Sequence, residues 1–487
     1  TPQPSTNKMP ETEILVNETV DGQPVGAATD GIAPSPPPEP RRRRQAPAKT
    51  AGAGAPNKPD KYIWGIYLFL VLVSIIEVYS ASSTEIKTEN VYSPLWGHIK
   101  FLVVGFVLVY LIQKVHYKFF RNLTWPIAVI CLGLVVYASM FGVRLNDAMR
   151  AIPIGGMTIQ PAEMLKLALV LVLAKIMQKN QISGGVSTKG VVWSAIVVAV
   201  FGLAVYQNGF TNMALMMVVS LAMFIIGGTQ FRKIGIVVLC YCVLFGGYLM
   251  VKSRASQTNE FDRVQAEEQM SQQQAYQGYG PHFQVNHSDD GSVDRTDMRK
   301  ERIRMWLKGV HPGEPVNDAN YQVKHAHYAM AHGGITGNMP GNSRESARLP
   351  LAFSDYIFSI IVEDWGLVGG IVLLVFYLLL VARAGVVASK CRRAYPALLI
   401  MGLAVMIAAQ ALVHMGIVTG VMPVSGQPLP LISKGGTSIL IMSVAFGMML
   451  SVSRFAVHSN DKAAIRAETR DLPEEMQTVN PLLVDKP

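Results

Sequence analysis

The sequence predicts an all-α integral membrane protein with about ten transmembrane helices. Half of its 487 residues are hydrophobic and only 16% are charged, whereas charged residues make up about 25% of soluble domains. Apolar runs long enough to cross a bilayer core of roughly 30 Å recur along the chain. The charged residues are confined to the gaps between these runs, which argues against buried core helices of a soluble protein.

The predicted spans are separated by short gaps and by one long gap. They cover residues 62–79, 97–113, 124–141, 161–177, 190–205, 211–228, 233–251, 356–382, 394–420 and 436–453. The long gap, residues 252–355, forms a large loop between the seventh and eighth spans. Its first half is rich in Gln, Ser and Asp, which predicts a flexible segment. A loop of this length is typically functional or disordered.

Basic residues in alternate gaps predict which side of the membrane each gap faces. If the N-terminus is cytoplasmic, the gaps that contain Lys114, Lys175, Arg232 and Arg383 also face the cytoplasm. Such gaps are expected to be basic, as these are. We therefore expect both termini in the cytoplasm and the 252–355 loop outside. The net charge of +10 lies mostly in residues that flank spans, so nucleic acid is not an expected partner.

The two ends of the chain differ in composition from the membrane domain, residues 61–455. Residues 1–60 are rich in Pro, Ala, Gly, Thr and Glu and are predicted to be a disordered cytoplasmic tail. Arg41–Arg44 in this tail are interpreted as a topology determinant or as a contact for anionic lipids or a partner. Residues 456–487 are polar and are predicted to be a second disordered cytoplasmic tail.

Polar side chains at membrane depth are costly to bury, so those in the spans are candidates for function. Glu163 and Lys166, at the start of the fourth span, share one helix face. They form either an internal ion pair that locks two helices or the lining of a polar cavity. Glu77 and His414 are interpreted as residues with satisfied structural hydrogen bonds.

Two further stretches carry candidate functional residues. Asp355 lies near the start of the eighth span, where the helix dipole favours a carboxylate and where position alone favours an N-cap. The proline-containing stretch 423–430 cannot form a regular helix. Irregular backbone at this depth is tolerated only inside protein or beside a water-filled cavity.

The four cysteines have no metal-ligand spacing with histidines, so the residues predict no metal site.

Four separated motifs lie at the ends of the predicted spans. They are Val78–Ser83; Asn146–Arg150 followed by Gln160–Glu163 and Lys166; Leu349–Phe358 continuing to Gly366; and Pro423–Ser438. In this order they resemble the SEDS family (shape, elongation, division and sporulation), over about residues 62–455. The chain departs from the family pattern at Ala151, Leu351, His414 and Ser425, among other positions. These departures bear on substrate contacts and leave Asp355 unchanged.

The resemblance implies a peptidoglycan glycosyltransferase of the bacterial inner membrane that polymerises lipid II. It implies a class B penicillin-binding protein and other division-complex membrane proteins as partners. The catalytic aspartate of the family corresponds to Asp355. The implied substrate-binding residues are Arg150, Gln160, Glu163, Lys166, Arg348 and Lys434; of these, Arg150, Arg348 and Lys434 are candidates to stabilise the leaving diphosphate. The resemblance assigns no definite cofactor, and a divalent cation, Mg or Mn, is a candidate for sharing this role.

Other functions fit parts of the sequence. Buried charges and a broken connection between the last two spans also suit a lipid II flippase. A transporter is expected to carry charges across the full membrane depth, whereas here they cluster toward the outer half, which favours an outward-facing enzyme. A structural scaffold of the division complex is a third alternative. The tail 1–60 and the residue sequence of Leu429–Ser433 favour the division type, FtsW, over the elongation type, RodA. We therefore expect the protein at the division septum.

Overall fold

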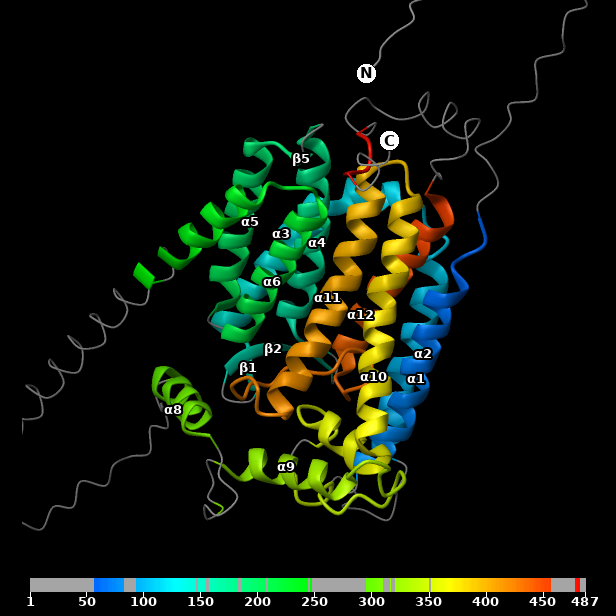
Figure 1. Ribbon diagram of the computed structural model, residues 1–487, viewed down its shortest axis with the longest axis vertical. Helices are drawn as coiled ribbons and strands as arrows, with labels where there is room; N and C mark the ends of the chain where they lie inside the picture. Colours follow the sequence, from blue (N-terminus) through cyan, green and yellow to red (C-terminus); the bar gives the residue numbers. More distant parts are fainter. Residues whose placement is uncertain are drawn as a thin grey trace, which may run out of the picture. The chain divides into compact units, whose positions relative to one another are not determined.

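Long apolar helices dominate the computed structural model, which describes residues 57–82, 93–145, 148–154, 157–182, 185–206, 209–243, 246–247, 295–309, 316, 320–349, 352–456 and 478–481 (Figure 1). The helices are α1 (Lys61–Ala81), α2 (Ser93–Ile112), α3 (Tyr117–Phe141), α4 (Pro161–Lys179), α5 (Thr188–Tyr206), α6 (Phe210–Ile226), α8 (Arg295–Lys308), α9 (Tyr321–Gly333), α10 (Ile357–Lys390), α11 (Ala394–Val418) and α12 (Gly436–Phe455). Residues 231–243 are also helical.

The predicted fold class is confirmed. Among the described residues, seven helices (α1, α2, α3, α5, α10, α11 and α12) are long and apolar enough to cross a membrane. Helices also occupy the other three predicted spans, as α4, α6 and residues 231–243. The predicted loop 252–355 contains α8 and α9, while its Gln-rich first half lies outside the described residues.

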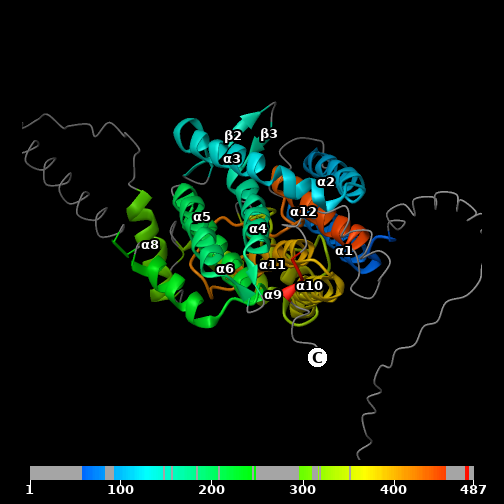
Figure 2. The same ribbon diagram turned by 90° about the horizontal axis from the view of Figure 1, so that it is seen from above.

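The apolar side chains of the bundle face two environments. Val103, Val107 and Tyr110 of α2 are exposed, as expected for a helix whose outer face contacts lipid. By contrast, α11 and α12 are mostly buried within the protein. Seen from above, α4 and α11 lie in the middle of the bundle, between α5 and α6 on one side and α12, α1 and α2 on the other (Figure 2). Polar side chains on α4 and α11 are therefore shielded from lipid.

Short strands replace part of the predicted loop before α4. β1 (Val143–Leu145), β2 (Ala148–Ile154) and β3 (Met157–Ile159) form an antiparallel three-stranded sheet. A second, two-stranded pair, β4 (Gln181–Ile182) and β5 (Gly185–Val186), follows α4. The hydroxyl of Thr437 donates to the Thr158 carbonyl at 3.2 Å, which ties β3 to the start of α12.

The predicted disordered tail 1–60 is wrong at its C-terminal end, while residues 1–56 lie outside the described residues. The carboxylate of Asp60 caps α1 by accepting from the backbone N–H groups of Tyr62 and Ile63 at 3.0 and 3.1 Å. It also pairs with the Arg383 guanidinium of α10 at 2.6 Å. Burial alone would raise the pKa of Asp60, but the hydrogen bonds and charge of Arg383 and the two backbone N–H groups outweigh burial and lower this pKa.

The prediction that the whole tail after Arg454 is disordered is also wrong, because Thr478–Pro481 packs against the turn between α10 and α11. Asn480 is fully buried. Its backbone N–H donates to the Arg392 carbonyl at 2.8 Å, and its side-chain amide donates to the Ala388 and Cys391 carbonyls at 2.8 and 2.7 Å. Carbonyls at a helix C-terminus lack hydrogen-bond donors within the helix. Asn480 supplies donors to the carbonyls at the end of α10.

Replacing Asn480 with alanine is expected to destabilise the protein by about 1–3 kcal/mol, because carbonyls at the end of α10 lose buried donors. Thermal unfolding of the purified protein in detergent measures this loss. Asn480→Asp preserves the shape and removes the N–H donors, so it should be at least as destabilising. Unchanged unfolding temperatures for both variants would mean that this segment does not hold the α10–α11 turn in solution.

Candidate active site

Two segments that are distant in sequence lie side by side at the start of α10. The backbone N–H of Lys434 donates to the Phe353 carbonyl at 2.9 Å. The hydroxyl of Ser433 donates to the Ser354 carbonyl at 2.7 Å. These bonds place Asp355 and Lys434, two of the sequence-predicted site residues, on adjacent segments.

The Asp355 carboxylate is half-buried and accepts a hydrogen bond from the Ser354 hydroxyl at 3.0 Å. α10 begins at Ile357, and its N-cap position is held by Tyr356, whose side chain makes no capping bond. The interpretation of Asp355 as the N-cap is therefore wrong. Helix capping therefore does not explain why a carboxylate stands at position 355.

The ammonium of Lys434 lies 4.8 Å from the centroid of the Phe353 ring, within the range of a cation–π contact. Lys434 and Phe353 are therefore joined twice, by this side-chain contact and by the hydrogen bond between their backbones. A carboxylate and a cation are thus presented by neighbouring segments. Such a pair suits a reaction that removes a proton and releases an anionic group.

The predicted irregular backbone of residues 423–430 is confirmed, and it continues to the start of α12. Leu431, which is almost fully buried, has a φ of 64°. A non-glycine residue in this region is uncommon and must be held by its surroundings. Tyr377 of α10 donates to the Pro430 carbonyl at 2.7 Å, and the backbone N–H of Leu429 donates to the Ser433 hydroxyl at 2.8 Å.

Glu163 and Lys166 form an ion pair, one of the two alternatives that the sequence left open, with 2.6 Å between the Lys166 ammonium and the Glu163 carboxylate. Both side chains are 2% exposed. The ammonium also donates to Gln410 of α11 at 2.6 Å, and the Gln410 amide donates to the Pro428 carbonyl at 3.1 Å. The pair thus links α4 and α11 to the irregular segment that carries Lys434. One carboxylate oxygen of Glu163 has no hydrogen-bond partner among the described residues.

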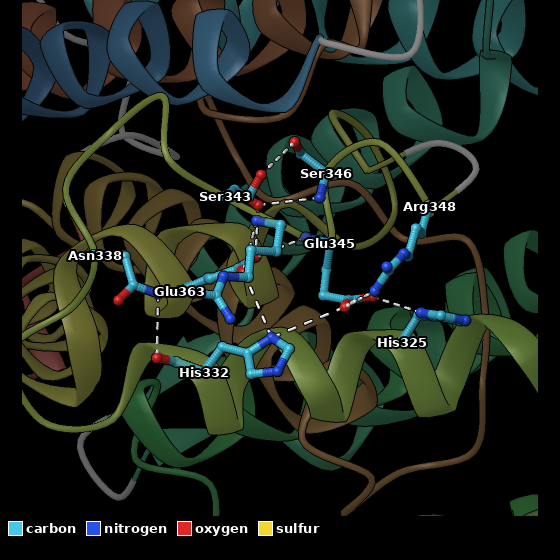
Figure 3. A network of polar contacts seen from close by, with 9 residues as sticks. His325, His332, Asn338, Ser343, Glu345, Ser346, Arg348 and Glu363 are labelled. Atoms are coloured by element: carbon cyan, nitrogen blue, oxygen red, sulfur yellow. Dashed lines mark hydrogen bonds and ion pairs between the residues drawn. The ribbon is translucent and has the colours of Figure 1, made fainter.

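Arg348 belongs to a separate polar cluster beside α9 (Figure 3). Its guanidinium, which is 60% exposed, pairs with the buried Glu345 at 3.0 Å. His325 also hydrogen-bonds to Glu345, and the His332 ring lies 3.8 Å from both Glu345 and Glu363. The structure therefore gives Arg348 a carboxylate partner, Glu345.

The buried Glu363 of α10 holds the turn that follows α9. It accepts from the Ser343 hydroxyl and from the backbone N–H groups of Arg344 and Glu345, the latter two at 2.9 and 3.4 Å. The backbone N–H of Asn338 donates to the Glu363 carbonyl at 3.0 Å. One residue of α10 thus anchors both ends of this turn.

α10 is broken where this turn meets it. Gly366 has a φ of 71° inside the helix, a conformation that favours glycine. A Cβ atom at Gly366 would lie 2.1 Å from the Ile335 carbonyl oxygen. Gly337 makes the matching close approach from the other side, since its Cβ would lie 2.3 Å from the Asp364 carbonyl oxygen. The glycines permit backbone-to-backbone contact between α10 and the chain after α9.

Replacing Glu363 with alanine is expected to loosen residues 343–345, because their N–H and O–H donors would lose a common acceptor inside the protein. Loss of such buried bonds is expected to lower stability by about 1–3 kcal/mol. Limited proteolysis of the 338–349 turn, together with thermal unfolding, measures the effect. Glu363→Gln retains an acceptor and should be milder; equal effects of the two substitutions would contradict this account.

For the remaining predicted site residues, Gln160 and Arg150, the structure gives a position in the chain but no side-chain contact at the site among the described residues. Gln160 precedes α4 and makes no side-chain capping bond. Arg150 lies in β2, but its side chain is outside the described part of the structure. The predicted structural bonds of Glu77 and His414 are confirmed in part. Glu77 accepts from the Trp365 indole and His414 Nδ1 lies 2.6 Å from the Gln427 carbonyl, but Glu77 Oε2 and His414 Nε2 are buried with no hydrogen-bond partner among the described residues.

Sequence reasoning missed three buried polar residues around the site: Ser74, His98 and Gln410. Each sits within an apolar span, where the cost of burying polar groups would have marked it as a candidate. The described residues contain no group of three or more His, Cys, Asp or Glu side chains that could hold a metal ion.

Comparison with known sequences gives matches over most of the chain. Stage V sporulation protein E of Bacillus subtilis is 27% identical over 411 residues, which cover 82% of this chain and 98% of that protein. The probable peptidoglycan glycosyltransferase FtsW of Enterococcus hirae is 26% identical over 430 residues, covering 85% and 97%. The peptidoglycan glycosyltransferase MrdB of Escherichia coli K12 is 23% identical over 392 residues, covering 80% and 91%.

Solved structures share the fold. A chain from a peptidoglycan synthase complex that coordinates polymerization and crosslinking aligns with a TM-score of 0.57 at 21% identity, covering 81% of this chain and 97% of that chain. The rod shape determining protein RodA of Thermus thermophilus aligns with a TM-score of 0.53 at 19% identity, covering 81% and 96%. Residues 60–288 and 292–458 match the sequence profile of the FtsW/RodA/SpoVE cell cycle proteins. The chain therefore belongs to this family, the SEDS family of polytopic membrane proteins.

Proposed function

We propose that this chain polymerises lipid II into glycan strands at the outer face of the bacterial cytoplasmic membrane. Its family membership, together with the names of its FtsW and MrdB relatives, makes it a peptidoglycan glycosyltransferase. The observation that carries the proposed chemistry is the placement of Asp355 and Lys434 on two segments that hydrogen-bond to each other.

In the proposed reaction, a sugar hydroxyl attacks the anomeric carbon of a sugar that carries a lipid-linked diphosphate. The new C–O bond forms while the bond from the anomeric carbon to the diphosphate oxygen breaks, and that electron pair leaves with the diphosphate. Asp355 accepts the proton of the attacking hydroxyl as the general base. Lys434 stabilises the negative charge of the leaving diphosphate.

The other predicted substrate-binding residues are assigned different roles in this proposal. Lys166 is neutralised by Glu163, so the pair shapes the floor of the site. Arg348, which pairs with Glu345, stays a candidate for contact with the diphosphate. Gln160 and Arg150 stay candidates for substrate contact. A divalent cation, Mg or Mn, bound through the substrate phosphates would lower the charge of the leaving group.

The proposed setting is the division septum, with a class B penicillin-binding protein and other division-complex membrane proteins as partners. The structural likeness to a chain of a peptidoglycan synthase complex supports a partner of this kind. The relatives include division, sporulation and MrdB-type proteins, so the septal role rests on the long tail 1–60 and on Leu429–Ser433. Basic residues in alternate gaps support cytoplasmic termini and an outward-facing site.

The test is polymer formation by the purified protein, with and without its class B partner, after addition of lipid II. In detergent solution there is no membrane across which lipid II could be transported, so glycan polymer on a gel supports a transferase. Absence of polymer even with the partner and divalent cations would instead favour the flippase or scaffold alternatives. Lipid II transport in vesicles would then separate those two.

A further inference from the structure

A buried hydrogen-bond chain joins α2 and α1 to the segment that carries Lys434. His98 of α2 and Ser74 of α1 are both almost fully buried. His98 Nε2 lies 2.7 Å from the Ser74 hydroxyl, and that hydroxyl donates to the Ile432 carbonyl at 2.9 Å. Ile432 is two residues before Lys434. The chain of bonds therefore extends from the second helix to the candidate active site.

The direction of these hydrogen bonds fixes the protonated nitrogen of His98. A carbonyl oxygen only accepts, so the single proton of the Ser74 hydroxyl points toward Ile432. The hydroxyl must then accept from His98, whose ring carries a proton on Nε2. His98 Nδ1 is buried and has no hydrogen-bond partner among the residues that the structure describes.

α2 contacts the same segment at a second point. Phe101 is three residues after His98, so the two side chains share one face of α2. A Cβ atom at Gly436 would lie 3.3 Å from the Phe101 ring, which places the ring directly against the segment. This face of α2 is therefore packed on residues 432–436.

The segment needs such support at this point. Leu431 adopts a backbone conformation that non-glycine residues rarely occupy. The carbonyl of the next residue, Ile432, is the one that Ser74 holds. Ser433 and Lys434 follow directly, and their bonds to Ser354 and Phe353 bring the two site segments together.

We propose that His98 is a positioning residue of the active site, which acts through Ser74 on the Ile432 carbonyl and thereby sets the position of Lys434 relative to Asp355. This inference rests on the proposed function, because it assigns a purpose to the placement of Lys434. His98 itself does not touch the reacting groups, since its influence runs through Ser74 and the backbone.

The first test does not depend on activity. Hydrogen–deuterium exchange is measured over residues 429–436 in the purified wild type, His98→Leu and Gln113→Leu. Gln113 is a matched control: it is buried near the other end of the same α2 helix and accepts from the Trp64 indole of α1 at 3.0 Å. We expect faster exchange in His98→Leu and wild-type exchange in Gln113→Leu. Equal exchange of this segment in all three proteins would overturn the proposal.

Two further variants separate a lost hydrogen bond from a general packing defect. His98→Gln can place an N–H donor near the position of Nε2, so it is expected to restore slow exchange of residues 429–436. Ser74→Ala removes the middle of the chain and is expected to resemble His98→Leu. Fast exchange in His98→Gln together with slow exchange in Ser74→Ala would contradict the bonded path.

The second test is kinetic. His98→Leu is expected to lower kcat about 10- to 100-fold, with KM little changed, because a displacement of about 1 Å can have this effect. In a Lys434→Met background the same substitution should have no further effect. Additive losses would show that His98 does not act through Lys434 and would overturn the proposal. If the wild type forms no polymer, the proposed function fails, whereas the exchange data still decide whether His98 holds the segment.

Discussion

Asp355→Asn is expected to lower lipid II polymerisation by at least about 100-fold, the usual contribution of a positioned general base. Asparagine keeps the size of the side chain and an oxygen that can accept from the Ser354 hydroxyl. It cannot accept the proton of the attacking sugar hydroxyl. Initial rates of polymer formation by wild type and variant, at equal folded protein and with the class B partner present, measure the effect.

Asp364→Asn provides the matched control, since Asp364 is a buried carboxylate of α10, the helix that begins two residues after Asp355, and it accepts from the Ser80 hydroxyl of α1. Asparagine can accept the same bond, so this variant should keep most of the polymerising activity. If Asp355→Asn retained wild-type rates, Asp355 would not be the base. Equal losses in both variants would point to a general effect of charge removal near the start of α10.

Lys166→Met is expected to destabilise the protein by about 3–5 kcal/mol, because it leaves the carboxylate of Glu163 buried without its cation. The pair is almost fully shielded, and Lys166 also provides the donor that Gln410 accepts. Methionine retains much of the length and apolar volume of the lysine stem, so packing changes little. Thermal unfolding in detergent, followed by size-exclusion chromatography, measures the loss.

The double variant Glu163→Gln with Lys166→Met removes both charges and is expected to recover a large part of this stability. Replacing a whole buried ion pair by neutral groups is often tolerated, whereas breaking it is not. A double variant as unstable as Lys166→Met would mean that the charge of Glu163 is not the cause. Recovery of stability without recovery of polymerisation would indicate that the pair also serves the reaction.

Local sequence patterns predicted the features that depend on near neighbours. Apolar runs gave the helices, the three-residue spacing gave the ion pair of Glu163 and Lys166, and prolines gave the irregular segment 423–430. Each of these follows from backbone geometry or from solvation within a few residues. The resemblance to known motifs then singled out Asp355, whose position alone suggested a helix cap.

The features that sequence reasoning missed depend on contacts between distant parts of the chain. No local pattern indicates that Lys166 meets Gln410, or that Asn480 completes the end of α10. The strands β1–β3 also went unpredicted, because β1 and β3 have only 3 residues each and the sheet gains its stability from pairing between the strands. Ser74 and His98 were visible as polar residues in apolar runs, but their common partner, Ile432, was not.

The break at Gly366 has a consequence for how the enzyme tolerates membranes of different thickness. The part of α10 from Leu367 to Lys390 is about 36 Å long, enough to cross the bilayer alone. A long spanning helix adjusts to a thicker or thinner membrane by tilting. The chain after α9 is bonded to α10 on both sides of this glycine, because Asn338 donates to the Glu363 carbonyl while Leu367 and Val368 donate to the Gly334 and Ile335 carbonyls. Tilt of the longer part is therefore expected to move the chain after α9 together with α10, which couples the membrane thickness to the turn that Glu363 anchors.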